Sequence, residues 1–210
     1  MNIKLAQPSL IGRAVLEISM NSVVKFLPSG KHLAIAAVIA FFMLLTRGSH
    51  VLSPVSLPDA SLALFLLGGL YLGRFGWFVL FFVLAAVIDF GMAALDPWQG
   101  FCLTDGYWGL IPAYGAMWLG GRWLATRQDA YAPLPYVVTA LLTTLIAFVI
   151  STQTYYLFSD RFPNNGVLHT MQYGWDYLPG YLGYTAMYFA IIWAGARLLR
   201  GWKTAAAARA

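Results

Sequence analysis

Cys102 is the only cysteine in the 210 residues, and it lies in the stretch DPWQGFCLTDGYWG, residues 96–109. A single cysteine excludes an intrachain disulfide and any CxxC metal or redox motif. The free thiol could act as a small hydrophobe, as a nucleophile or as a metal ligand. A soft sulfur ligand favours a transition metal over magnesium or calcium.

A zinc site would need three or four protein ligands. Cys102 and His169 are the only plausible cysteine and histidine ligands in the outer loops, so the sequence cannot easily build one. One protein thiol suffices only when the metal arrives already chelated. A thiol enzyme, with Cys102 activated by His169, is the alternative from another functional class.

Asp89 lies inside an apolar segment, AAVIDFGMAAL, where an ionised carboxylate costs at least about 2.5 to 3.5 kcal/mol. Such a residue needs a partner or a cavity. We expect either a hydrogen bond to a Tyr, Thr or Gln of a neighbouring helix, or a position in the wall of a substrate cavity that opens outward.

Aromatic side chains surround the thiol: Trp98, Phe101, Tyr107 and Trp108 fall within eleven residues. Such a cluster suits a large flat apolar ligand. Tryptophan and tyrosine also accumulate at membrane interfaces without any ligand. Both interpretations stay open at this point.

The elements that position these residues are predicted to be membrane helices. Hydrophobic residues make up 60% of the chain and charged residues 10%, and the mean hydropathy is +0.68. Continuous apolar runs indicate helices, because a barrel would alternate apolar and polar residues. Six spans are expected, at residues 33–46, 60–73, 75–95, 107–124, 134–158 and 177–199.

The expected fold class is therefore an all-α membrane protein, a bundle of six transmembrane helices with both termini in the cytoplasm. Residues 25–202 form this domain, and residues 203–210 form a polar tail. Residues 1–24 form either an N-terminal extension or an interfacial helix, unless the true start lies nearer Met20.

The distribution of charge predicts the orientation. With six spans, eleven of the thirteen basic residues fall on one side, and only Arg47 and Arg161 fall on the other. The positive-inside rule makes the first side cytoplasmic. Cys102 then faces outward, and the net charge of +5 reflects topology and anionic lipid rather than nucleic-acid binding.

Small residues predict close helix contacts. Ala36 and Ala40 in the first span are spaced four apart, as are Gly69 and Gly73 in the second. Internal packing is the default interpretation, and a docking face for a membrane partner is the alternative.

Three residues limit the choice of protein family: Asp89, Cys102 and Tyr107, in the frame VIDFGMAALDPWQGFCLTDGYWGLIPAYGAMWLGGR. This frame resembles the BtuM family, small bacterial cobalamin transporters related to the substrate-binding S components of energy-coupling-factor transporters. The resemblance covers roughly residues 25–202.

The resemblance implies a cobalamin (vitamin B12) uptake protein of the bacterial inner membrane, with its binding site facing the exterior or periplasm. It implies that Cys102 is the axial ligand of the cobalt in base-off cobalamin, and that cyanide on the cobalt can be lost when the thiolate binds. Asp89 and Tyr107 carry over as cavity residues. On physical grounds we expect them to hydrogen-bond either each other or the amide side chains of the corrin rim.

The cobalamin is expected as the transported ligand, and no intrinsic cofactor is expected. Ala36 and Ala40 would match the stretch through which S components dock on an energy-coupling membrane module. An S component for a different vitamin, with Cys102 as packing, remains the second hypothesis.

Overall fold

The apolar runs of the sequence form helices in the computed structural model, which describes residues 29–47, 57–96, 100–101, 103–162 and 166–207. Within these ranges the chain contains no strand. It divides into two compact units, residues 1–34 and residues 35–210. The second unit holds everything described below apart from the first residues of α2.

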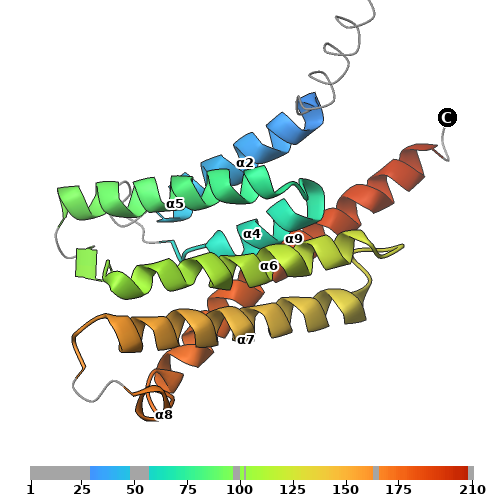
Figure 1. Ribbon diagram of the computed structural model, residues 1–210. Coiled ribbons are helices and arrows are strands. Elements are labelled where there is room, and N and C mark those ends of the chain that lie inside the picture. The colour runs from blue at the N-terminus through green and yellow to red at the C-terminus, as the bar shows by residue number, and fades with distance from the viewer. Residues whose placement is uncertain (1–28, 48–56, 97–99, 102, 163–165, 208–210) are drawn as a thin grey trace, which may run out of the picture. The chain divides into compact units, whose positions relative to one another are not determined.

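The helices have the following bounds: α2 Gly30–Arg47, α4 Ser61–Tyr71, α5 Phe75–Leu95, η2 Asp105–Gly109, α6 Leu110–Ala125, α7 Pro133–Phe158, α8 Val167–Thr170, η3 Trp175–Tyr177 and α9 Leu178–Ala207 (Figure 1). The helix α5 has the limits that the sequence predicts. The fourth expected span differs, because residues 105–109 form a 3-10 turn and the α-helix begins at Leu110.

Four helical segments among the described residues are long and apolar enough to cross a membrane: Gly30–Arg47, Phe75–Leu95, Pro133–Phe158 and Val167–Trp202. The helix α4 is apolar but has only 11 residues, which corresponds to a length of about 16 Å. The described residues are thus all-helical, as the sequence predicts.

The exposed faces of the long helices are apolar. Along α5, Val79, Val83 and Val87 are all more than 40% exposed. A surface of this kind on a water-soluble monomer would be unusual, whereas lipid accommodates it. The structure is therefore compatible with a protein embedded in a membrane.

Glycine allows α6 to approach α4 closely; Figure 1 shows α6 between α4 and α7. A Cβ atom on Gly69 would lie 2.0 Å from the backbone oxygen of Trp118, and one on Gly121 would lie 1.9 Å from that of Leu66. Gly73 has a different function, because it ends α4 in a left-handed conformation with φ +64°.

The small residues of α2 also pack inside this unit. Ala36 is 6% exposed, and Ala40 is partly buried against the same core. The same core contains Met43, Phe65 and Phe81, each fully buried. In this structure the two alanines contact their own chain.

Candidate functional site

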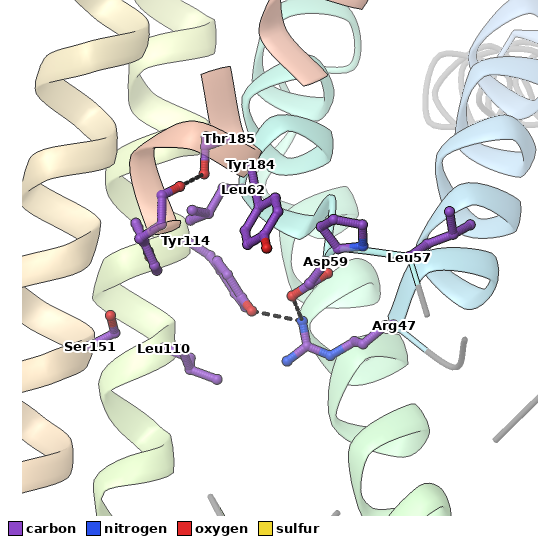
Figure 2. A pocket seen from close by; sticks show the side chains of 11 residues that line it. Arg47, Leu57, Asp59, Leu62, Leu110, Tyr114, Ser151, Tyr184 and Thr185 are labelled. Carbon is purple, nitrogen blue, oxygen red and sulfur yellow. Dashed lines mark hydrogen bonds and ion pairs between the residues drawn. The ribbon is translucent and has the colours of Figure 1, made fainter. Parts of the chain in front are cut away.

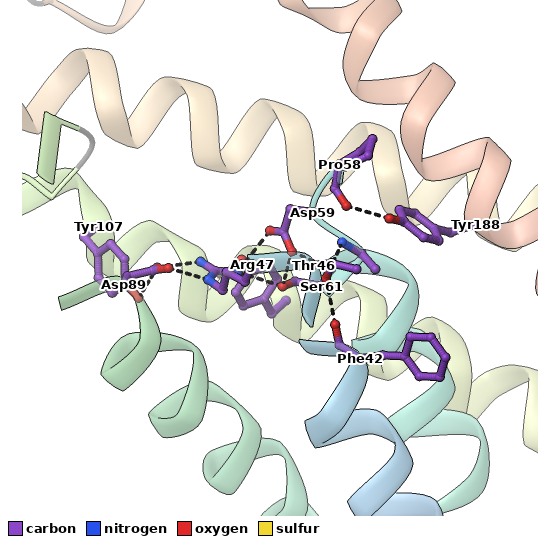
Figure 3. Close-up of polar contacts among 11 residues, drawn as sticks. Phe42, Thr46, Arg47, Pro58, Asp59, Ser61, Asp89, Tyr107 and Tyr188 are labelled. Carbon is purple, nitrogen blue, oxygen red and sulfur yellow. Dashed lines mark hydrogen bonds and ion pairs between the residues drawn. The ribbon is translucent and has the colours of Figure 1, made fainter. Parts of the chain in front are cut away.

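The centre of the candidate site is an ion pair between the end of α2 and the C-terminal half of α5. Arg47 Nε donates to Asp89 Oδ1 at 2.5 Å, and Arg47 Nη2 donates to Asp89 Oδ2 at 2.6 Å (Figure 3). The two side chains are 10% and 16% exposed. The pair is bidentate, with two parallel charge-assisted hydrogen bonds, and this is the strongest arrangement for an arginine and a carboxylate. Asp89 thus has its partner.

The third nitrogen of Arg47 is also engaged by the protein. Nη1 donates to Asp59 Oδ2 at 3.1 Å, to Ser61 Oγ at 2.7 Å and to Tyr114 Oη at 2.8 Å. The guanidinium therefore joins α2, the start of α4, α5 and α6. A cation held in this way serves first to fix the bundle and the groups around it.

Tyr107 completes the chain of polar contacts. Its hydroxyl donates to Asp89 Oδ2 at 2.9 Å, and the residue is 7% exposed. Two glycines let the η2 turn sit tightly on α7: a Cβ on Gly106 or Gly109 would lie within 2.5 Å of Thr154 atoms. The turn therefore presents Tyr107 to Asp89 in a fixed position.

A cavity of about 520 Å³ lies beside this network (Figure 2). This volume is within the usual range of small-molecule sites, about 300 to 1,000 Å³. The end of α2, the segment before α4, and α4, α6, α7 and α9 contribute its walls. The lining residues are Arg47, Leu57, Pro58, Asp59, Leu62, Leu110, Tyr114, Ser151, Tyr181, Tyr184 and Thr185.

Asp59 links the cavity to the start of α4. Its Oδ1 accepts hydrogen bonds from the backbone N–H and the hydroxyl of Ser61, at 2.9 and 2.6 Å. Its side chain is 46% exposed, against 10% for that of Arg47. Asp59 is thus the more accessible of the two charged residues in the cavity wall.

Stacking holds the ring of Tyr114 in the cavity wall. The ring lies parallel to Phe65, with centroids 4.3 Å apart and an interplanar angle of 9°. The hydroxyl accepts from Arg47. The aromatic ring and the hydroxyl thus have separate partners, which fixes the side chain at the boundary between core and cavity.

The structure places the residues predicted for the site in different surroundings. Asp89 and Tyr107 contact each other. Phe101 and Trp108 are 55% and 59% exposed and do not line the cavity. Trp98 and Cys102 lie outside the described residues. The aromatic residues that line the described cavity are Tyr114, Tyr181 and Tyr184.

His169, in α8, has a hydrogen-bond partner of its own. The Nε2 atom of His169 and the hydroxyl of Tyr173 share a hydrogen bond of 3.3 Å on an exposed surface. Within the part of the chain that the structure describes, no three His, Cys, Asp or Glu side chains gather as a metal site.

A second charged cluster lies at the other end of α6, α7 and α9. Asp129 accepts from Arg200 Nη1 at 2.5 Å and from Arg197 Nη1 at 3.4 Å. The hydrogen bond from Arg200 is the main reason why the pKa of Asp129 lies below its ordinary value of 3.8. The three side chains are 36% to 49% exposed, so this cluster adds little to stability.

The sequence did not predict three residues of the candidate site: Arg47, Asp59 and Tyr114. One signal was available, because Arg47 is one of only two basic residues predicted on the outer side and follows an apolar run directly. A basic residue at the end of one predicted span and the aspartate inside another, Asp89, could have been paired by their opposite charges. No comparable signal marked Tyr114, since tyrosine is common along the chain.

Neither the comparison with protein families nor the comparison with curated proteins finds a match to this chain.

Proposed function

We propose that this chain is a cobalamin uptake protein of the bacterial inner membrane that binds the corrin from the outer face. The observation that carries the proposal is the hydrogen bond from Tyr107 to Asp89. It connects the turn that follows Cys102 with Arg47 and therefore with the cavity. A ligand in the cavity would lie close to that turn.

Cys102 is the proposed axial ligand of cobalt. The corrin supplies four nitrogen ligands, so that a single soft protein ligand is sufficient. With cyanocobalamin the step is a ligand exchange: the cobalt–cyanide bond breaks, a cobalt–sulfur bond forms, and the thiol proton leaves with cyanide as hydrogen cyanide. Cobalt keeps its oxidation state, so no reductant is needed.

The size of the cavity limits how the ligand sits. A complete cobalamin is larger than 520 Å³, so on this proposal one edge of the corrin, with its amide side chains, occupies the described cavity. The remainder extends toward the segment of Cys102 and Trp98, which lies outside the described residues.

The proposed topology has six spans with both termini in the cytoplasm. It is supported by the positions of the basic residues, eleven of which fall on one side of such an arrangement. The cavity residues Tyr114, Ser151 and Tyr181 lie in the halves of their helices that this topology places toward the outside.

A second function is favoured by the cavity volume itself. About 520 Å³ would enclose a smaller vitamin completely. In that case the chain is an S component for another vitamin, and Cys102 contributes only packing.

Growth tests the proposal. A cobalamin-dependent bacterium that lacks its usual importer should grow on trace cobalamin when it expresses this chain, and Cys102→Ser should abolish that growth. A thermal-shift screen of the purified chain against vitamins separates the two functions: preference for a small heterocycle, with indifference to Cys102→Ala, would support the second.

A further inference from the structure

The wall of the described cavity contains two charged residues, Arg47 and Asp59, and the hydrogen bonds of Arg47 all go to the protein itself. All three nitrogens of the Arg47 guanidinium donate to protein oxygens, from Asp89, Asp59, Ser61 and Tyr114. A ligand anion would have to compete with two carboxylates for this cation. Arg47 is therefore a poor receptor for a carboxylate or phosphate group.

The cluster of charged side chains around Arg47 also has an excess of negative charge. Arg47 contributes one positive charge, and Asp59 and Asp89 contribute one negative charge each, which leaves a formal charge of −1. The other polar residues of the cavity wall, Tyr114, Ser151, Tyr181, Tyr184 and Thr185, carry neutral hydroxyls. The field inside the cavity thus favours positive charge or hydrogen-bond donors.

Asp59 is the group that a ligand can reach. Its side chain is 46% exposed. Its Oδ1 is fixed by the two hydrogen bonds from Ser61, which orients the carboxylate. Each carboxylate oxygen has more than one lone pair, so Asp59 can accept further hydrogen bonds from a ligand.

We infer that Asp59 is a specificity-determining residue that selects ligands with N–H donors, such as carboxamides, and rejects carboxylates at the same position. The inference rests on the proposed function. A corrin rim carries several carboxamide side chains, and hydrolysis of one of them replaces two donors by a negative charge. The substituted ligand would then face Asp59 with like charge.

The test compares cyanocobalamin with its separated monocarboxylic acids, in which one rim propionamide is hydrolysed. Dissociation constants are measured by equilibrium competition on the purified full-length chain. At least one acid should bind wild type about 10- to 100-fold more weakly, the effect of one hydrogen bond to a charged group. Asp59→Asn should bring this ratio close to one, because an amide tolerates both ligands.

The matched control is Asp176→Asn, which removes an exposed outer carboxylate that does not line the cavity; it should keep the wild-type ratio. Asp59→Ser is the second variant, because serine keeps a short acceptor before α4. Equal binding of all acids and of cyanocobalamin to wild type overturns the inference. So does a large ratio that survives both Asp59 variants. If wild type binds no corrinoid, the proposed function fails and the inference fails with it.

Discussion

The guanidinium of Arg47 holds both carboxylate oxygens of Asp89, at 2.5 and 2.6 Å, although the residues are 42 positions apart in the chain. Both side chains are largely buried. A carboxylate within an apolar helix and an arginine thereby neutralise each other where either alone would be costly. This pair ties α2 to α5 next to the cavity.

Asp89→Asn should destabilise the protein strongly. The substitution leaves a buried guanidinium with one carboxylate instead of two, and removal of one partner from a buried pair costs about 3 to 5 kcal/mol. Because Asp59 remains, we expect the lower end of this range. The measurement is the free energy of unfolding in detergent micelles, with Asp176→Asn as control. A loss no larger than that of the control would contradict the assigned pair.

Tyr107→Phe should cost less, about 1.5 to 3 kcal/mol, because it removes one hydrogen bond to a charged group and keeps the ring. Tyr177→Phe, at a residue that is 71% exposed, is the matched control and should be neutral. A double-mutant cycle with Asp89→Asn measures the coupling. Additive losses would show that the two side chains do not interact.

Gly121→Ala should destabilise the contact between α4 and α6. Its Cβ would lie 1.9 Å from the backbone oxygen of Leu66, so the helices must separate, and overpacking typically costs about 1 to 3 kcal/mol or more. Gly115→Ala lies in the same helix and meets nothing within 4 Å. Its unfolding free energy should stay within about 1 kcal/mol of wild type. Similar values for the two variants would be incompatible with this packing.

Asp129→Asn should change the pH dependence of stability at acid pH. The pKa of Asp129 is lowered in the folded protein by Arg200, so the pair contributes fully above the ordinary value of 3.8 and is lost as the pH falls through the lower folded value. The difference in Tm between wild type and Asp129→Asn should therefore be small but constant near neutral pH and should vanish in acid. A difference that grows on acidification would reverse the predicted sign.

The sequence predicted the helices better than their contacts. An uninterrupted apolar run gave Phe75–Leu95 its correct limits, since length and hydropathy are local properties. The turn at Tyr107 was taken as α-helix because its 3-10 geometry depends on the fit of Gly106 and Gly109 against α7. That fit is a tertiary contact, which the local pattern does not encode.

The candidate site was predicted only in part, for the same reason. The sequence indicated that Asp89 needs a partner, and it left open whether that partner is Tyr107 or the corrin rim. It did not select Arg47, because nothing local specifies which helices are neighbours. The chain has twelve tyrosines, and nothing in the neighbouring sequence distinguishes those that line the cavity from the others.

The most direct test of the central claim is the absorption spectrum of cyanocobalamin mixed with the purified chain. Exchange of cyanide for the thiolate of Cys102 changes the axial field on cobalt, so the corrin bands should shift with wild type and stay unshifted with Cys102→Ser. An unchanged spectrum with wild-type protein, under conditions where binding is measured independently, would contradict the cobalt–thiolate assignment.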